Sequence, residues 1–343
     1  MKPHVLVVRL DSDGDVLVTG PAVRAVAAGA SRVTLLSGPR GEQAARLLPG
    51  VDRLVVHRAA WIDPEPDPVD RAAILALVDE LAALRADSAV IFTSFHQSAL
   101  PTGLLLRMAG IRRIGGISDD YPGSLLDVRH RVRDDLHEVE RALSLAAACG
   151  FHLPRADDGR LAVRRPADRI PLAPGYVVLH PGASVPARAW PAALHAELAE
   201  RLAESGRRVV VTGSPGEREL TAAVAGAHPG VVDLGGRTSL GELAVVLGDA
   251  DAVVVGNTGP AHLAAAVGAP VVSLFAPVVP AVRWRPWKVP HVLLGDQDAP
   301  CAGTRARECP LPGHPCLASV RPEDVEEALK QLVPATQREA VAL

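Results

Sequence analysis

The chain has 343 residues, of which 48% are hydrophobic and 22% are charged, and its formal net charge is −3. This composition is typical of a globular protein of two domains, and the mixing of acidic with basic residues excludes a basic face for nucleic acid. The sequence has no run of about 18 apolar residues to cross a bilayer, and its start leads directly into a strand pattern instead of a signal peptide. We therefore expect a cytoplasmic protein without a transmembrane segment.

Apolar stretches rich in β-branched residues alternate with amphipathic stretches throughout the first half of the chain. This alternation predicts an α/β domain with a parallel sheet. We expect strands at 5–9, 33–37, 53–57, 89–93 and 112–116. Helices are expected at about 16–28, 69–84 and 135–149, and two further helices are expected to end near residue 48 and near residue 108.

The loop after the first strand holds three carboxylates, Asp11, Asp13 and Asp15. A solvated loop is one interpretation, with Asp15 placed as the N-cap of the next helix. The D-x-D-G motif of aspartyl-phosphate hydrolases is another, but that chemistry needs a lysine downstream, and none occurs between Lys2 and Lys288. The spacing fits neither a calcium loop nor a dinucleotide fingerprint. The remaining functional interpretation is a general base, because a carboxylate within hydrogen-bond reach can take a hydroxyl proton.

Residues 153–174 are rich in Pro, Arg and Asp and follow no period, which indicates a connection between domains. Strand signals resume at 176–180, 208–212, 231–233, 252–256 and 271–275, and a final helix is expected at 322–332. We therefore predict two doubly wound Rossmann-like domains, at 1–160 and 161–333, followed by a tail at 334–343. Because doubly wound parallel sheets bind ligands at the carboxyl ends of their strands, we expect the ligand in a central cleft that both sheets face.

Two turns of the second half could meet a nucleotide. Ser184 and Arg188, which follow the strand at 176–180, are suited to a pyrophosphate because a fixed guanidinium can bind two phosphates. Arg188 could equally be a surface residue. Glu242 follows a predicted helix start and could accept hydrogen bonds from both ribose hydroxyls, or it could be an ordinary acid of a first helical turn.

A third turn follows the strand at 252–256 and opens a helix with Pro260 near its first position. The helix start offers free backbone N–H groups and the positive end of a dipole, which favours phosphate. Asn257, Thr258, Gly259 and His262 lie in or beside this turn. An ordinary crossover with a well-capped helix is the alternative.

The four cysteines are too few for a disulfide framework in a chain of this size. Cys301, Cys309 and Cys316 cluster in one loop near His314, but structural zinc usually shows paired C-x₂₋₄-C knuckles, which this spacing lacks. We therefore predict no metal site.

Taken together, the motifs resemble glycosyltransferase family 9, the family of ADP-heptose:lipopolysaccharide heptosyltransferases, over most of the chain. The resemblance rests on Ser12-Asp-Gly-Asp15, on His180-Pro-Gly-Ala-Ser184 with Arg188-Ala-Trp-Pro191, and on Asn257-Thr-Gly-Pro-Ala-His-Leu263. Leu274-Phe-Ala-Pro277, Trp284-Arg-Pro-Trp287 and the cysteine loop also match.

The resemblance implies a GT-B fold, an acceptor on the first domain, a nucleotide-sugar on the second, and inverting, metal-independent transfer without a cofactor. Asp15 would be the general base, and Ser184 and Arg188 would neutralise the diphosphate leaving group. The implied donor-binding residues are Ser184, Arg188, Glu242, Asn257, Thr258, Gly259 and His262. Asp13 and His96 are the acceptor-side candidates, although a capped loop histidine is the alternative for His96.

Three positions depart from the family pattern. Asn257 stands where the family usually has Asp, which removes a charge from the sugar pocket. Arg188 replaces a common Lys and keeps the charge. Phe275-Ala276 and Val278-Val279 replace a frequent F-G-P-T-D pattern.

We therefore predict an enzyme, a glycosyltransferase that moves a sugar, with heptose expected, from a nucleotide-diphospho-sugar such as ADP-heptose. The acceptor is a hydroxyl of a glycan or a natural product, and peripheral association with a membrane is left open. The alternatives are an inactive nucleotide-binding module and a GT-B-fold epimerase or hydrolase of a nucleotide-sugar.

Overall fold

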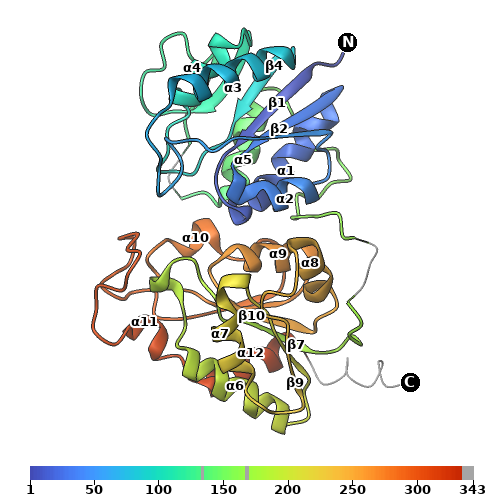
Figure 1. The fold of residues 1–343 in the computed structure, drawn as a ribbon, viewed down its shortest axis with the longest axis vertical. Helices are drawn as coiled ribbons and strands as arrows, with labels where there is room; N and C mark the ends of the chain where they lie inside the picture. The colour runs from blue at the N-terminus through green and yellow to red at the C-terminus, as the bar shows by residue number, and fades with distance from the viewer. Residues whose placement is uncertain (133–134, 167–169, 334–343) are drawn as a thin grey trace. The chain divides into compact units, whose positions relative to one another are not determined.

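The computed structural model describes residues 1–132, 135–166 and 170–333, so the predicted tail at 334–343 lies outside the described residues. The chain divides into two compact units, Met1–Arg164 and Arg165–Leu343 (Figure 1). The predicted boundary lies between residues 160 and 161.

The first unit is built on a parallel sheet in the strand order β3-β2-β1-β4-β5-β6. Its strands are β1 (His4–Arg9), β2 (Arg32–Ser37), β3 (Arg53–Val56), β4 (Ser88–Ile91), β5 (Arg113–Ile117) and β6 (Val128–His130). Its helices are α1 (Asp13–Gly29), α2 (Glu42–Leu47), α3 (Arg71–Ala83), α4 (Leu100–Met108) and α5 (Glu138–Ala148), with a short 3₁₀ helix η1 (Pro39–Gly41).

Helices cover both faces of this sheet because its central strands are apolar on both sides. Leu6 and Val8 of β1 pack in one cluster with Leu81 of α3 and Leu106 of α4. Helix α1 packs against α5 and α2. The arrangement is doubly wound, as the alternating pattern predicted.

The second unit repeats the topology, with the strand order β12-β11-β10-β7-β8-β9. Its strands are β7 (Val177–His180), β8 (Val209–Val211), β9 (Val231–Asp233), β10 (Ala252–Gly256), β11 (Val271–Leu274) and β12 (His291–Leu294). Its helices are α6 (Ala192–Glu204), α7 (Arg218–Ala225), α8 (Leu240–Gly248), α9 (Gly259–Val267), α10 (Ala281–Trp284), α11 (Pro315–Ala318) and α12 (Pro322–Leu332), with 3₁₀ helices η2 (Pro186–Arg188) and η3 (Pro215–Glu217). Helices α6 and α12 share a core cluster with the strands, and α8 packs against α9 (Figure 1).

The prediction that Asp15 is an N-cap is wrong. The N-cap of α1 is Ser12, so the helix begins at Asp13 and not near Val16. Asp15 is three residues into the helix, and its Oδ2 accepts hydrogen bonds from the Ser12 backbone nitrogen (3.3 Å) and hydroxyl (2.7 Å). A serine followed three residues later by an acid is the sequence pattern of a capping box, which places the helix start at the serine.

Strands β6 and β12 were not predicted. Both are short edge strands whose residues are only partly buried. Within the ranges that the structure describes, no helix combines the length and apolar character needed to cross a bilayer.

Candidate functional site

The strand order of each sheet reverses once, between β1 and β4 in the first unit and between β7 and β10 in the second. In doubly wound sheets, ligands bind at such a reversal, beyond the carboxyl ends of the two strands, because the following loops diverge there. The predicted site residues Asp15, Ser184, Arg188 and Asn257 all follow one of these four strands. Each reversal is therefore a separate candidate site.

Arg9, the last residue of β1, is the centre of a buried charged cluster in the first unit, with only 2% of the residue exposed. Its Nη2 donates to Asp15 Oδ1 (2.9 Å) and to Ser94 Oγ (2.9 Å). Its Nε lies 2.9 Å from Asp11 Oδ2, an ion pair by distance that lacks hydrogen-bond geometry. The guanidinium therefore holds two carboxylates and a hydroxyl together.

Two further charged residues enlarge this cluster from α5. Glu138 is buried, and its Oε2 lies 3.8 Å from Arg141 Nη1. Arg141 also donates to the Thr93 carbonyl, which ties α5 to the loop after β4. The buried cluster thus contains the cations of Arg9 and Arg141 and the carboxyl groups of Asp11, Asp15 and Glu138.

The environment separates the proton affinities of the two aspartates. Burial is the largest influence on Asp15 and by itself raises its pKa, but Arg9 and the hydrogen bonds from Ser12 outweigh it, so the pKa lies below its usual value. For Asp11, burial prevails over Arg9, and the neighbouring Asp15 adds to it, so the pKa of Asp11 is raised to about 6. Asp15 is therefore ionised at neutral pH, and Asp11 is the stronger proton acceptor of the two.

Neither of the two acceptor-side candidates, Asp13 and His96, makes a described bond to this cluster. Asp13 points toward α2, where its Oδ1 accepts from the Ala44 backbone nitrogen (2.9 Å), and burial raises its pKa to about 6. His96 is exposed and its ring stacks edge-on against Phe95, with 5.4 Å between ring centroids.

In the second unit, the turns after β7 and β10 meet. Arg188 ends the 3₁₀ helix η2, and its Nη1 lies 3.5 Å from the Asn257 carbonyl. A Cβ on Gly256 would stand 3.0 Å from the Arg188 carbonyl, so a glycine there permits the close approach of the two backbones. Arg188 and the Asn257 turn therefore lie side by side at the strand reversal of the second unit.

Asn257 is buried, and its Oδ1 accepts from the Ala276 backbone nitrogen (3.4 Å) while Nδ2 has no hydrogen-bond partner among the described residues. Thr258 is the N-cap of α9 and Gly259 its first residue. His262 lies in the first helical turn, buried, with its ring 6.2 Å from that of Trp284. A buried amide donor and the start of α9 thus lie beside Arg188.

Neither Ser184 nor Glu242 makes a described bond to Arg188 or to the Asn257 turn. Ser184 is exposed in the turn before η2. Glu242 forms a capping box at the start of α8, where its Oε2 accepts from the Ser239 backbone nitrogen (2.7 Å) and hydroxyl (2.8 Å). These hydrogen bonds lower the pKa of Glu242. Its Oε1 is not used by the cap, so the helix-start role and a ligand role do not exclude each other.

The cysteine loop packs into the core of the second unit, where Cys301 and Cys316 are buried. Burial, and next the neighbouring thiols of Cys301 and Cys309, raise the pKa of Cys316 to about 11. Among the residues described, no group of three or more His, Cys, Asp or Glu side chains is arranged to hold a metal ion.

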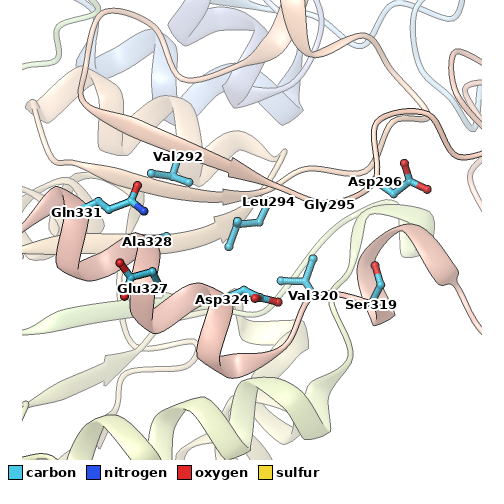
Figure 2. Close-up of a pocket in the computed structure, with 10 residues that line it drawn as sticks. All are labelled: Val292, Leu294, Gly295, Asp296, Ser319, Val320, Asp324, Glu327, Ala328 and Gln331. Atoms are coloured by element: carbon cyan, nitrogen blue, oxygen red, sulfur yellow. The ribbon is translucent and has the colours of Figure 1, made fainter.

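A pocket of about 500 Å³ lies between the edge strand β12 and helix α12 (Figure 2). Its lining includes Leu294, Asp296 and Glu327 and none of the predicted site residues. The pocket is therefore separate from the strand reversal between β7 and β10.

Sequence reasoning missed four polar residues of the first cluster. These are Ser94, Gln97, Glu138 and Arg141. The signal for them was Arg9, a cation at the end of an otherwise apolar strand. A buried cation needs carboxylate partners, so polar residues were to be expected around it.

The chain is similar to known proteins over much of its length. The model of "Glycosyltransferase family 9 (heptosyltransferase)" matches residues 74–314. Lipopolysaccharide heptosyltransferase 1 of Pseudomonas aeruginosa is 35% identical over 221 residues, which cover 62% of this chain and 61% of that protein's length.

Two solved structures share the fold over nearly their whole length. A glycosyl transferase family 9 protein from Veillonella parvula is 18% identical, with a TM-score of 0.78 over 97% of this chain and 98% of that chain. The ADP-heptose lps heptosyltransferase II of E. coli is 21% identical, with a TM-score of 0.74 over 98% and 99%. The prediction of a GT-B fold, with two doubly wound parallel domains, is confirmed.

Proposed function

The chain belongs to glycosyltransferase family 9, and from that premise we propose that it transfers heptose from ADP-heptose to a hydroxyl of a glycan or small-molecule acceptor. Asp15 lies outside the matched residues 74–314, so its role rests on its own geometry. The observation that carries the proposal is the ion pair by which Arg9 holds the carboxyl group of Asp15 at the strand reversal of the first unit. A carboxylate fixed in this way is suited to take a hydroxyl proton.

In the proposed reaction, the acceptor hydroxyl gives its proton to Asp15 as its oxygen attacks the anomeric carbon of the donor. The bond from that carbon to the diphosphate oxygen breaks, and the diphosphate leaves with the electron pair. A single displacement of this kind inverts the anomeric configuration. Arg188 and the N–H groups at the start of α9 stabilise the charge that develops on the diphosphate, which is the task that a metal ion performs in other enzymes.

The first test is the identity of the nucleotide. The proposal predicts that ADP raises the melting temperature of the full chain more than UDP or GDP does at equal concentration, because a ligand stabilises the native state according to its affinity. Differential scanning fluorimetry with the three nucleotides, without added metal and again with excess chelator, measures this. A shift with UDP equal to or larger than that with ADP would contradict the ADP assignment, and loss of the ADP shift in chelator would contradict metal-independent binding.

Glu242→Gln separates the two roles of Glu242. Glutamine also completes a capping box, so the melting temperature of the unliganded variant should stay near that of the wild type. The proposed ribose contact loses a charged acceptor, worth about 1.5–3 kcal/mol, so the Kd for ADP should rise at least about tenfold. Titration calorimetry measures this, and Asp324→Asn, at the capping box that begins α12, is the matched control that should leave the Kd unchanged. An unchanged Kd in Glu242→Gln would restrict Glu242 to its cap.

A further inference from the structure

Ser94 lies between the two aspartates of the buried cluster. Its Oγ is 3.2 Å from Asp15 Oδ1 and 3.5 Å from Asp11 Oδ2, and it accepts a hydrogen bond from Arg9 Nη2. A serine hydroxyl carries one proton and can donate to only one acceptor at a time. Ser94 therefore donates to Asp15 or to Asp11, and a rotation about its C–O bond exchanges the two.

Asp15 has no acceptor position to spare while Ser94 donates to it. A carboxylate offers about four lone-pair positions. Oδ1 receives Arg9 and Ser94, and Oδ2 receives the Ser12 nitrogen and hydroxyl. An incoming acceptor hydroxyl can reach Oδ1 only if one of these donors turns away, and Ser94 is the donor with a second carboxylate within reach.

The charge of the cluster favours Asp11 as the final holder of a proton. The two cations named in this cluster, buried Arg9 and half-buried Arg141, face three carboxyl groups, Asp11, Asp15 and Glu138, so full ionisation gives these five groups a net charge of −1. Gln97 also donates to Asp11 Oδ1 and fixes that side chain in the loop after β4. Arg9 stabilises the ionised form of Asp15, whereas burial raises the pKa of Asp11 to about 6, so a proton that arrives on Asp15 is more stable on Asp11.

We propose that Ser94 and Asp11 form a proton relay that serves Asp15 during sugar transfer. Ser94 first turns its hydroxyl to Asp11, which frees an Oδ1 position on Asp15 for the acceptor hydroxyl. When Asp15 has taken the acceptor proton, it passes that proton to Ser94 Oγ while Ser94 gives its own proton to Asp11 Oδ2. Asp15 is again a carboxylate, Ser94 is unchanged, and Asp11 releases the proton to solvent after the products leave.

The relay rests on the proposed function, and its test is the pH dependence of kcat in three variants of the full chain. The assay is ADP release from ADP-heptose with heptose-free lipopolysaccharide as the acceptor probe. In the wild type, kcat should fall below about pH 6, because the relay needs an ionised Asp11 to receive the proton. Asp11→Asn and Ser94→Ala should each lower kcat about tenfold with the donor KM unchanged. In both variants the acid limb of the pH profile, which is the fall of kcat at low pH, should move to lower pH.

Two further variants control for a merely structural effect. Asp251→Asn removes a carboxyl group of the second unit whose pKa burial also raises, and the fall of kcat at low pH should stay near pH 6 in this variant. Ser94→Thr retains the hydroxyl and should restore much of the rate that Ser94→Ala loses. If Asp11→Asn does not fold, the comparison of Ser94→Ala with Ser94→Thr tests the relay, because both variants keep the ion pairs of Arg9.

An acid limb that remains near pH 6 in both Asp11→Asn and Ser94→Ala, or a kcat that neither variant lowers, would overturn the relay while leaving the proposed function intact. Full transfer by Asp15→Asn would overturn the base role of Asp15 and the relay with it. A wild type that neither binds ADP-heptose nor transfers its sugar to any glycan or small-molecule acceptor offered would overturn the proposed function.

Discussion

Asp15→Asn is expected to abolish sugar transfer while the nucleotide still binds. The amide cannot take the acceptor proton, and loss of a general base typically costs about 10²–10⁴-fold in kcat. Asparagine is close in size to aspartate, and its Oδ1 can still accept from Arg9 or Ser12, so the start of α1 should persist. The measurement is kcat for ADP release in the presence of acceptor, with product analysis by mass spectrometry.

The control for this variant is the affinity for ADP. The proposed donor-binding groups Arg188 and Asn257 belong to the second unit, so the Kd for ADP should match that of the wild type. Turnover close to that of the wild type would remove Asp15 from the reaction. The wild type should release little free sugar without an acceptor, and rapid release would indicate a nucleotide-sugar hydrolase instead of a transferase.

The central strands could be predicted because burial on both faces requires an unbroken apolar run. Val253–Val255 in β10 and Val5–Val8 in β1 have such runs, and both strands lie in the middle of their sheets. The edge strands β6 and β12 have weaker patterns, because β6 contains the single apolar residue Val128 and β12 has only the short apolar run Val292–Leu294 between His291 and Gly295. Their pairing with β5 and β11 depends on the rest of the sheet and not on their own sequence.

The positions of the candidate residues after their strands could be predicted better than the hydrogen bonds between their side chains. Parallel strands bind ligands at their carboxyl ends, so the segments that follow β1, β7 and β10, with Asp15, Arg188 and Asn257, were identifiable from the strand pattern alone. Which side chains meet across neighbouring loops depends on the fold. Ser94 is 79 residues from Asp15 in the sequence, yet the adjacency of β1 and β4 brings their oxygen atoms to 3.2 Å.

The structure shows how Asn257, which stands where the family usually has Asp, is bonded. Its Oδ1 is occupied by the Ala276 backbone nitrogen, whereas its buried Nδ2 has no hydrogen-bond partner among the described residues. A buried donor without a partner is costly, so a bound ligand that presents an acceptor there would gain a hydrogen bond. An aspartate at the same position would offer an acceptor instead, so this residue is suited to distinguish donor sugars.

Arg9→Met is expected to destabilise the first unit by about 3–5 kcal/mol, because removing one partner of a buried ion pair leaves the other charges uncompensated. Methionine fills a similar volume but leaves the carboxyl groups of Asp11, Asp15 and Glu138 buried with Arg141 as the remaining cation of the cluster. The matched control is Arg46→Met in the same unit, which breaks an exposed i,i+4 pair with Glu42 and should cost about 0.3–0.5 kcal/mol.

The pH dependence of the loss identifies its cause. Without Arg9, burial raises the folded-state pKa values of the three carboxyl groups above their unfolded values, so the folded variant binds more protons and its stability falls as pH rises. The deficit relative to the wild type should therefore be larger at pH 8 than at pH 5. Hydrogen exchange of β1 and β4, compared with β7 and β10, measures the two units separately, which a single melting temperature of a two-unit chain does not. A deficit that is equal at both pH values would mean that Arg9 acts through packing of its side chain, and equal losses in both units would contradict a local ionic role.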